Sequence, residues 1–473
     1  MYRGKFEHQR TPGPKRRWPL VLIALVAVAA GAGALTLALG GQGSRGTQTL
    51  DSAPTTEATT ATIAATAATT EATTAPTTEA TTAPTEPFVV STASLGVTGD
   101  ILMHTPVLTA GRISGEYDFT DNYTYITDYY SRYDLMIANL EVTLGGPEVC
   151  EYVGYPIFNC PDTVIDAMLS AGIDMVLTAN NHTYDTGYTG LIRTQEVLDE
   201  KGMDYVGTRL SEDSATFLVQ DVNDIKIGMA CYTYESGKTN NGRKTLNGNV
   251  LSREAGPLVC SFDYTDLDSF YAEVEQTLQA MDTAGAEISM VFLHWGDEYQ
   301  LTPNDNQTAI AQALCELGVD VIVGGHPHVL QPVTTLTSST GHETVCVYST
   351  GNAISNQRRS KISRSPKGHT EDGMIFELEI EKWNDGSVAI SAIDVLPTWV
   401  NLDTKDGKRV YSIIPIDAQV TDWTVFDVED ADYIYTSYER TMGVVGEGLN
   451  QCRAALGLEA IPVSIVPEET AQG

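Results

Sequence analysis

Carboxylate, amide and imidazole side chains recur at the ends of apolar, strand-like runs along this chain of 473 residues. In chain order they are Asp100, Asn139 and Glu141, then Asn180, Asn181 and His182, then His294, then His326 and His328. Ligands bind at the carboxyl ends of strands in α/β sheets, because the loops there converge on one edge. Five strand ends that carry such groups therefore indicate a binding site and not a pattern of core packing.

These residue types indicate a metal site. Their oxygen and imidazole donors suit Mn, Zn, Fe or Mg and do not favour soft, thiophilic ions. Two such cations held close together need a bridging carboxylate, and they can clamp the attacking and leaving oxygens of a displacement reaction. In the segment GGHPHVLQPV, His326 and His328 stand two residues apart, so their rings can reach neighbouring metals from an extended turn. The preceding glycines, 324 and 325, allow the backbone to come close to the site. The sequence predicts two divalent metal ions and does not distinguish among these elements.

The elements that must position these groups alternate along the chain from Phe88. Apolar, β-branched runs predict strands over 94–100, 135–141, 174–181, 225–234, 288–296, 319–326 and 344–352. Helical apolar spacing with glycine stops predicts helices over 163–172, 188–202, 266–285 and 306–318. Alternation of this kind predicts a layered α/β domain with buried sheets.

Six motifs in this order make the chain similar to a known family. They are TGDILMH, ANLE, TANNHTYDTG, LHWGDEY, GGHPHVLQP and YSTGNAISNQ, and the similarity extends from Ser94 to about Val400. The chain resembles the CapA (poly-γ-glutamate capsule synthesis) family, a branch of the calcineurin-like metallophosphatase superfamily. The resemblance implies a four-layer αββα sandwich with a metal site at one edge. It also implies export, membrane anchorage and a part in making or handling an anionic cell-surface polymer.

Matched motif by motif, the resemblance implies a role for each group. The implied metal ligands are Asp100, Glu141, Asn181, His294, His326 and His328. Glu141 takes the place where the superfamily usually has a metal-bridging aspartate. His182 matches a histidine that contacts the substrate oxygen and not a metal, and Asp185 follows at a spacing that lets its carboxylate orient the ring. His182 and Asp185 are thus the catalytic candidates. Further candidates without a settled role are His104, Asn139, Glu298 and Asn352.

Three departures from the family pattern bear on activity. The first motif of the superfamily is usually Asp-x-His, whereas His104 lies four residues after Asp100. His104 therefore either ligates a metal or caps the next segment. Ala353 stands where the family more often has a bulky aromatic residue. Glu141 is longer than aspartate, which alters the expected metal spacing. The chain is therefore expected to be a metal-dependent hydrolase; the alternative is a non-catalytic subunit of a capsule synthesis and export complex that uses the metals as a scaffold.

The first 87 residues predict a membrane tether. Residues 1–18 are basic, and the uncharged run 20–39 lies within a segment, 19–41, whose helix would cross about 30 Å of hydrocarbon. The positive-inside rule places the N-terminus in the cytoplasm and the bulk of the chain outside the cell membrane. The length of the run favours a signal-anchor helix over a cleaved signal peptide. Residues 42–87, rich in Thr, Ala, Glu and Pro, predict a disordered stalk.

The remaining chain is expected to form two parts. Residues 88–400 correspond to the metallophosphatase-type domain. Residues 401–473 correspond to a C-terminal extension that docks on this domain, with a helix-like portion over 431–456 and a disordered acidic tail.

Charge and cysteine content narrow the partners. The 62 Asp and Glu residues outnumber 28 Lys and Arg residues, and a net charge of -34 repels phosphates and excludes nucleic acid. The expected partners are the membrane and an anionic polymer or a capsule synthesis complex. Seven cysteines are too few for a disulfide scaffold, although Cys150 and Cys160 either form one bridge or remain thiols. The basic run 358–369 is either an anion-contacting loop or a solvated one. A buried ligand set argues against a simple display protein such as an adhesin.

Overall fold

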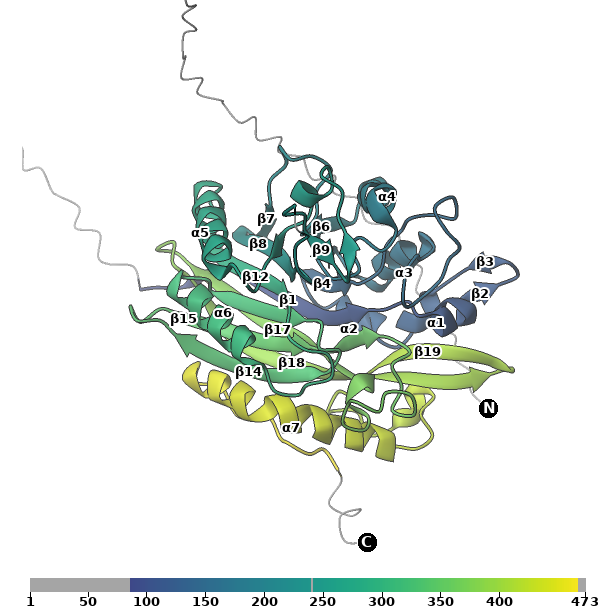
Figure 1. The fold of residues 1–473 in the computed structure, drawn as a ribbon. Coiled ribbons are helices and arrows are strands. Elements are labelled where there is room, and N and C mark those ends of the chain that lie inside the picture. Colours follow the sequence, from purple (N-terminus) through teal and green to yellow (C-terminus); the bar gives the residue numbers. More distant parts are fainter. Residues whose placement is uncertain (1–85, 240, 467–473) are drawn as a thin grey trace, which may run out of the picture. The chain divides into compact units, whose positions relative to one another are not determined.

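The computed structural model describes residues 86–239 and 241–466 (Figure 1). These residues belong to the compact unit Thr82–Gly473, which is distinct from the unit Met1–Thr81. The expected anchor, 19–41, and nearly all of the expected stalk lie outside the described residues. Within the part of the chain that is described, no helix is both long enough and apolar enough to cross a bilayer.

Two mixed sheets form the centre of this unit (Figure 1). The first has the order β19-β18-β17-β1-β4-β5-β6, with β16 beside β1. Its strands are β1 (Val89–Ile101), β4 (Leu135–Leu140), β5 (Met175–Leu177), β6 (Asp204–Val206), β16 (Asn352–Ile354), β17 (Asp372–Trp383), β18 (Val388–Lys405) and β19 (Lys408–Pro415). Strands β1, β4, β5 and β6 run parallel, and β17 joins β1 in antiparallel pairing.

The second sheet has the order β11-β8-β12-β13-β15-β14, with β7 beside β8. Its strands are β7 (Phe217–Val222), β8 (Ile225–Tyr234), β11 (Ser261–Phe262), β12 (Ile288–His294), β13 (Val321–Gly325), β14 (Leu330–Thr337) and β15 (Glu343–Thr350). Strands β8, β12, β13 and β15 are parallel. Parallel strands buried on both faces read as continuous apolar runs, which is why they were visible in the sequence.

Helices cover the outer faces of the two sheets. The helices are α1 (Thr105–Ala110), α2 (Thr127–Tyr130), α3 (Thr163–Ala171), α4 (Gly187–Lys201), α5 (Leu267–Thr283), α6 (Asp305–Glu316) and α7 (Asp432–Ala455). Helices α3 and α4 lie on the side of the first sheet, and α5 and α6 lie on the second (Figure 1). Residues of both sheets, among them Val97 and Met290, share one buried core, whereas Phe270 of α5 packs in a separate core behind the second sheet. The layers therefore follow the expected αββα order.

Glycines end two of the predicted helices. Gly172 (φ 96°) follows α3 and Gly202 (φ 71°) follows α4, and both adopt the left-handed conformation that closes a helix with little strain. Short elements complete the unit: β2 (Arg112–Ile113), β3 (Glu116–Tyr117), β9 (Thr245–Leu246), β10 (Asn249–Val250), and the 3-10 turns η1 (Thr120–Tyr123), η2 (Gly256–Leu258), η3 (His369–Glu371) and η4 (Trp423–Phe426).

The C-terminal region differs from the sequence expectation in one respect. The boundary placed at residue 400 falls inside β18, which continues to Lys405 and pairs with β19 along the edge of the first sheet. The helix-like portion forms α7, which packs against β14 and β18 (Figure 1). The first sheet thus extends beyond the segment 88–400, because pairing with β19 continues along β18 from Thr398 to Lys405.

The cysteines of the described unit are all free thiols. Cys160 is buried and Cys150 is partly exposed, and Cys150 lies 3.4 Å from the Asn159 side-chain nitrogen. Of the two alternatives left open by the sequence, the structure therefore has the pair of thiols.

A partly buried carboxyl in the first sheet should make stability depend on pH. Glu377 of β17 accepts a 2.5 Å hydrogen bond from the Tyr133 hydroxyl, and burial raises the pKa of Glu377 to about 7. Above pH 7 folding buries an ionised carboxylate, and this cost disappears as the pH falls toward the ordinary glutamate pKa. At pH 8, Glu377→Gln should therefore raise the free energy of unfolding by about 2 kcal/mol.

Chemical denaturation at pH 8 and pH 5 measures this effect. The gain should shrink strongly at pH 5, and Glu379→Gln, an exposed neighbour on the same strand, should change little at either pH. An equal gain at both pH values would contradict the assignment.

Candidate metal centre

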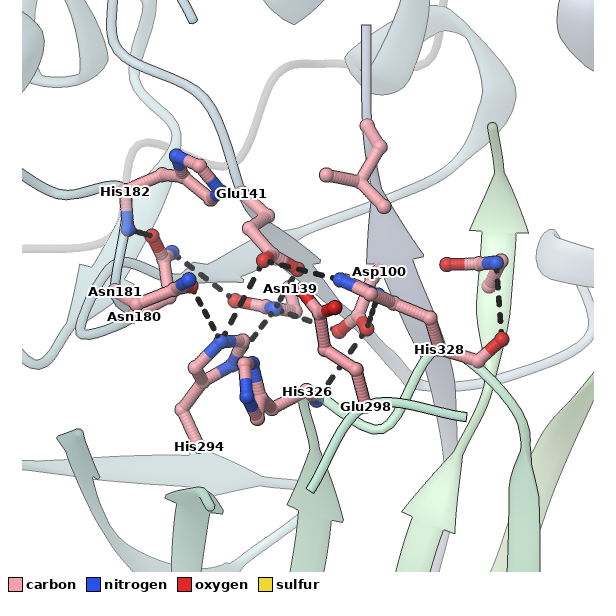
Figure 2. Close-up of polar contacts among 12 residues, drawn as sticks. Asp100, Asn139, Glu141, Asn180, Asn181, His182, His294, Glu298, His326 and His328 are labelled. Carbon is pink, nitrogen blue, oxygen red and sulfur yellow. Dashed lines mark hydrogen bonds and ion pairs between the residues drawn. The ribbon is translucent and has the colours of Figure 1, made fainter. Parts of the chain in front are cut away.

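The predicted ligands lie together where the carboxyl ends of strands from both sheets meet (Figure 2). From the first sheet, β1 carries Asp100, β4 is followed by Glu141, and Asn181 follows β5. From the second sheet come His294, at the end of β12, and the pair His326 and His328 after β13. Each of these side chains is at most 5% exposed. Neither sheet carries the whole set, so the centre depends on the packing of the two sheets.

Glu141 belongs to two groups of potential metal ligands. Donor atoms of Glu141, His294 and His326 lie within 4.8 Å of one another, and so do those of Asp100, Glu141 and His328. The Glu141 Oε1 atom lies 3.5 Å from His294 Nε2 and 3.8 Å from His328 Nε2. His328 Nδ1 lies 3.0 Å from Asp100 Oδ2. One carboxylate placed between two groups has the position of a bridging ligand.

Amide side chains complete and orient the two groups (Figure 2). Asn181 Oδ1 lies 2.9 Å from His294 Nε2, which adds an oxygen to the first group. Asn139 turns its amide nitrogen inward and donates to Asp100 Oδ1 at 2.7 Å and to Glu141 Oε2 at 3.4 Å. Asn180 in turn donates to Asn139 Oδ1 at 3.3 Å. Asn139 and Asn180 therefore hold the carboxylates in place, whereas Asn181 offers an oxygen to a metal.

The residues present fit a divalent metal. Within residues 86–239 and 241–466, the buried atoms Glu141 Oε1 and His326 Nδ1 have no hydrogen-bond partner. A buried polar atom left in this way costs about 1–3 kcal/mol, and a cation would satisfy both atoms. Burial, with the charges of His294 and His328, lowers the pKa of His326 well below 6.5, so the ring keeps the lone pair that a ligand needs. Although burial opposes it, the charges of Glu141 and Asp100 raise the pKa of His328 to about 9.

The backbone of the histidine turn is strained in a way typical of functional sites. His326 (φ 96°) and His328 (φ 56°) both have positive φ, which is uncommon for residues with a side chain. Just before them, a Cβ added to Gly325 would lie 2.9 Å from Asp100 Oδ1. The close approach expected of these glycines is therefore present.

His182 and Asp185 form a contact of their own beside the metal ligands. His182 Nδ1 lies 2.7 Å from Asp185 Oδ2, and both side chains are buried. The same carboxylate oxygen accepts the backbone N–H of Phe158 at 2.8 Å, and the Phe158 ring packs edge-on against His182 at 4.7 Å. Because Asp185 occupies Nδ1, Nε2 is the nitrogen left for a substrate oxygen.

Comparison with known proteins places this centre in a family. Residues 94–357 match the family described as bacterial capsule synthesis protein PGA_cap, which is more than half of the chain. The chain belongs to this capsule synthesis family. All of the predicted metal ligands, together with His182 and Asp185, lie within the matched residues.

Two curated relatives come from Bacillus. The chain is 28% identical over 266 residues to the PGA biosynthesis protein CapA of Bacillus subtilis (strain 168), a match that covers 54% of this chain and 62% of that protein. It is 26% identical over 334 residues to the capsule biosynthesis protein CapA of Bacillus anthracis, covering 67% and 74%. The chain thus spans less than two thirds of the length of the B. subtilis relative.

Similar solved structures include two enzymes. One is the sulfate thiohydrolase SoxB of Thermus thermophilus, with a TM-score of 0.33, 13% identity and coverage of 74% of this chain and 60% of that chain. The other is the purple acid phosphatase PPD1 of yellow lupin, with a TM-score of 0.31, 12% identity and coverage of 63% and 53%. TM-scores this low support no conclusion about the present chain.

In this member of the capsule synthesis family, His104 stands at the N-cap position of α1, where its backbone oxygen accepts from Val107 and Leu108, and it is not a metal ligand. It lies outside both ligand groups, and its side chain makes no capping bond to α1, which it precedes. Its Nδ1 atom lies 3.3 Å from the Asn356 backbone nitrogen, and burial lowers the pKa of His104 to about 4. The buried residues 101–103 separate His104 from Asp100 along the chain. The His104 ring packs edge-on against Phe158, beside the metal centre.

The other two additional candidates surround the histidine turn. Asn352 donates to the backbone oxygens of His328 and Thr370, at 3.2 and 3.0 Å, and so holds the turn in place. Glu298 also lies outside both ligand groups, and its carboxylate pairs with Arg364 at 3.0 Å. Neither residue is positioned as a ligand in this geometry.

Two tyrosines line the centre without having been predicted as site residues. The Tyr234 ring, at the end of β8, lies 4.9 Å from the His326 ring, and the Tyr299 ring lies 6.3 Å from His328. Tyr234 is the last residue of β8, and Tyr299 follows β12 by five residues. Their place at the ends of parallel strands is the sequence signal that could have identified them as site residues. They form an aromatic wall on the side of the histidine turn.

Proposed function

We propose that this chain is a metal-dependent hydrolase with two divalent cations that acts outside the cell in the synthesis, export or anchoring of an anionic capsule polymer. The observation that carries the proposal is the position of Glu141 between two ligand groups. The capsule context comes from the family, and the names of both Bacillus relatives refer to PGA or capsule biosynthesis. A poly-γ-glutamate type of polymer is therefore the substrate class to test first.

The two groups divide the ligands between two positions. Asp100, Glu141 and His328 would hold one cation, and Glu141, Asn181, His294 and His326 would hold the other. Bound there, the cations would supply Lewis-acid polarisation of a phosphoryl or carbonyl oxygen and an activated water.

His182 would carry the proton for the leaving group. A proton on its Nε2 makes the ring an imidazolium, because Nδ1 already donates to Asp185. The buried Asp185 carboxylate stabilises that charge and fixes the direction in which Nε2 points. His182 then donates from Nε2 to the departing oxygen or nitrogen, and Asp185 acts through His182 without touching the substrate.

Metal analysis and hydrolysis assays on the full-length chain, purified in detergent, test the proposal. We expect two metal ions per chain and hydrolysis of either phosphoesters or γ-glutamyl oligomers that a chelator abolishes and added metal restores. A chain that holds no metal would contradict the proposal. Two bound metals without turnover, together with normal capsule assembly by a His182→Ala chain, would favour the non-catalytic scaffold instead.

The proposal includes a single-pass anchor over 19–41 and a spacer over 42–87, supported by the uncharged run and the Thr/Pro-rich composition. Protease added to intact cells should remove the domain and leave the anchor in the membrane fraction. A mature chain found free in the medium, beginning near residue 41, would show a cleaved signal peptide.

A further inference from the structure

The basic loop 358–369 has two kinds of arginine. Arg358 and Arg359 both pair with Glu371, whose side chain is 1% exposed, with Arg358 Nε 3.1 Å from Glu371 Oε1 and Arg359 Nε donating to Oε2 at 2.6 Å. Arg358 also donates to the backbone oxygen of Val400 at 2.6 Å. Glu371 thus holds both guanidiniums, and these two arginines anchor the base of the loop.

Arg364 lies in the middle of the same loop and is 75% exposed. Its guanidinium stands over the Tyr299 ring, with Cζ 5.1 Å from the ring centroid, and Tyr299 in turn lies 6.3 Å from the metal-ligand candidate His328. Its Nη2 atom lies 3.0 Å from Glu298 Oε2, and Figure 2 shows Glu298 on the same side of the centre as His326 and His328. Arg364 is therefore held by Glu298 and Tyr299, two adjacent residues beside the histidine turn.

That segment is itself tied to the histidine turn. The Tyr299 backbone N–H donates to the Pro327 oxygen at 2.7 Å, and the Tyr299 hydroxyl accepts from Gln357 at 3.3 Å. Tyr299 is thus bonded both to the base of the loop, through Gln357, and to the histidine turn, through Pro327. These two contacts set the position of Arg364 relative to the metal ligands. This arrangement is preorganised, which lowers the entropy lost when a ligand binds.

Most of the guanidinium remains free to bind. A guanidinium has five N–H donors in a planar fork, and only the bond to Glu298 is made by the Arg364 side chain within the described residues. A fork of this kind matches the two oxygens of a carboxylate or a phosphate. The only other cations of the loop are Lys361, which donates to Asn356 Oδ1, and Lys367.

We propose that Arg364 binds an oxyanion of the substrate, a carboxylate or a phosphate, next to the bond that is cleaved at the metal centre. Glu298 and Tyr299 are positioning residues that hold the guanidinium beside the histidine turn. The inference rests on the proposed function for the identity of the reaction, and it adds the substrate class. For a γ-glutamyl polymer, the anion is the free carboxylate of the unit beside the scissile amide.

The experiment uses the full-length, metal-loaded chain and its Arg364→Ala, Arg364→Lys and Lys367→Ala variants. Binding of a γ-glutamyl oligomer, of its carboxyl methyl ester and of inorganic phosphate is measured by calorimetry, and turnover is measured in parallel. Lys367→Ala is the matched control, because it removes an exposed cation of the same loop that lacks the contacts to Tyr299 and Glu298.

We expect Arg364→Ala to weaken binding of the oligomer about 10- to 100-fold, which is the range for a charge-assisted hydrogen bond. KM should rise by a similar factor with kcat nearly unchanged, and the methyl ester should bind both chains equally. Arg364→Lys should recover only part of the loss, because lysine keeps the charge without the planar fork. Metal content and Lys367→Ala affinity should remain at wild-type values.

The three ligands and the Lys367→Ala control distinguish the possible results of this experiment. A loss of phosphate affinity with unchanged oligomer affinity would identify phosphate as the bound group. Equal losses for Arg364→Ala and Lys367→Ala, or no loss for either, would overturn the inference and leave an ordinary surface ion pair with Glu298. A wild-type chain that binds metal and oligomer but hydrolyses nothing would contradict the proposed function. The calorimetric binding measurements would still decide whether Arg364 binds an oxyanion.

Discussion

Glu141→Gln should remove metal from both positions and abolish hydrolysis. Glutamine has nearly the same shape as glutamate but lacks the charge, and Glu141 is the one residue that belongs to both ligand groups. Changes that only disturb the partners of metal ligands already cost about 10- to 100-fold in metal affinity. Loss of a bridging carboxylate should exceed that range, so bound metal should fall from two ions per chain to fewer than one after dialysis.

Metal analysis after dialysis, at fixed free-metal concentration, measures this effect. The matched control is Glu235→Gln, which changes another buried carboxyl that lies outside both groups and contacts Lys244. Glu141→Asp keeps the charge and should retain metal, which distinguishes loss of ligation from misfolding. If Glu141→Gln retained both metals, the bridging role would be wrong.

His182→Ala should leave the metals in place and remove most of the turnover. The ring lies beside Asn181 but belongs to neither ligand group, and its Nδ1 atom is held by Asp185 at 2.7 Å. A positioned acid or hydrogen-bond donor of this kind contributes about 10²- to 10⁴-fold in rate. We therefore expect kcat to fall by that factor, with the metal content and melting temperature near wild type.

His328→Ala should give the opposite result and lower metal occupancy. His328 is a candidate ligand that contacts both Asp100 and Glu141. Asp185→Asn should reduce kcat less than His182→Ala does and shift its pH profile, since it removes the charge that stabilises the imidazolium. If His182→Ala lost metal and His328→Ala kept it, the two roles would have to be exchanged.

The kinds of ligand and their order along the chain were predictable from the sequence. Asp100, His294 and the His326–His328 pair each follow an apolar run that forms a parallel strand. Parallel strands in one sheet end at the same edge, so a sequence that marks strand ends also marks candidates for the site. The His182–Asp185 contact was predictable for a similar reason, because three residues of local chain bring the two side chains together.

Other features were not predictable, because they depend on residues far apart in the sequence. The roles within the basic loop follow from the pairing of Arg358 and Arg359 with the buried Glu371 and of Arg364 with Glu298, 66 residues earlier. Composition marked the whole run 358–369 as basic and could not separate anchoring arginines from an exposed one. His104 was equally ambiguous, since its distance from the ligands depends on how the buried residues 101–103 fold beneath the centre.

By itself, the sequence of this protein determined the ligand chemistry, the parallel strands that carry it and the family to which the domain belongs. Only the tertiary structure decided that Glu141 is shared by two groups of ligands. One group combines Glu141 with His294 of β12 and His326 after β13, and the other combines it with Asp100 of β1 and His328 after β13. It also decided that β18 crosses residue 400 and that Tyr234 and Tyr299 wall the centre. Local sequence sets residue types and strand ends, whereas the sharing of one carboxylate requires two sheets to pack face to face.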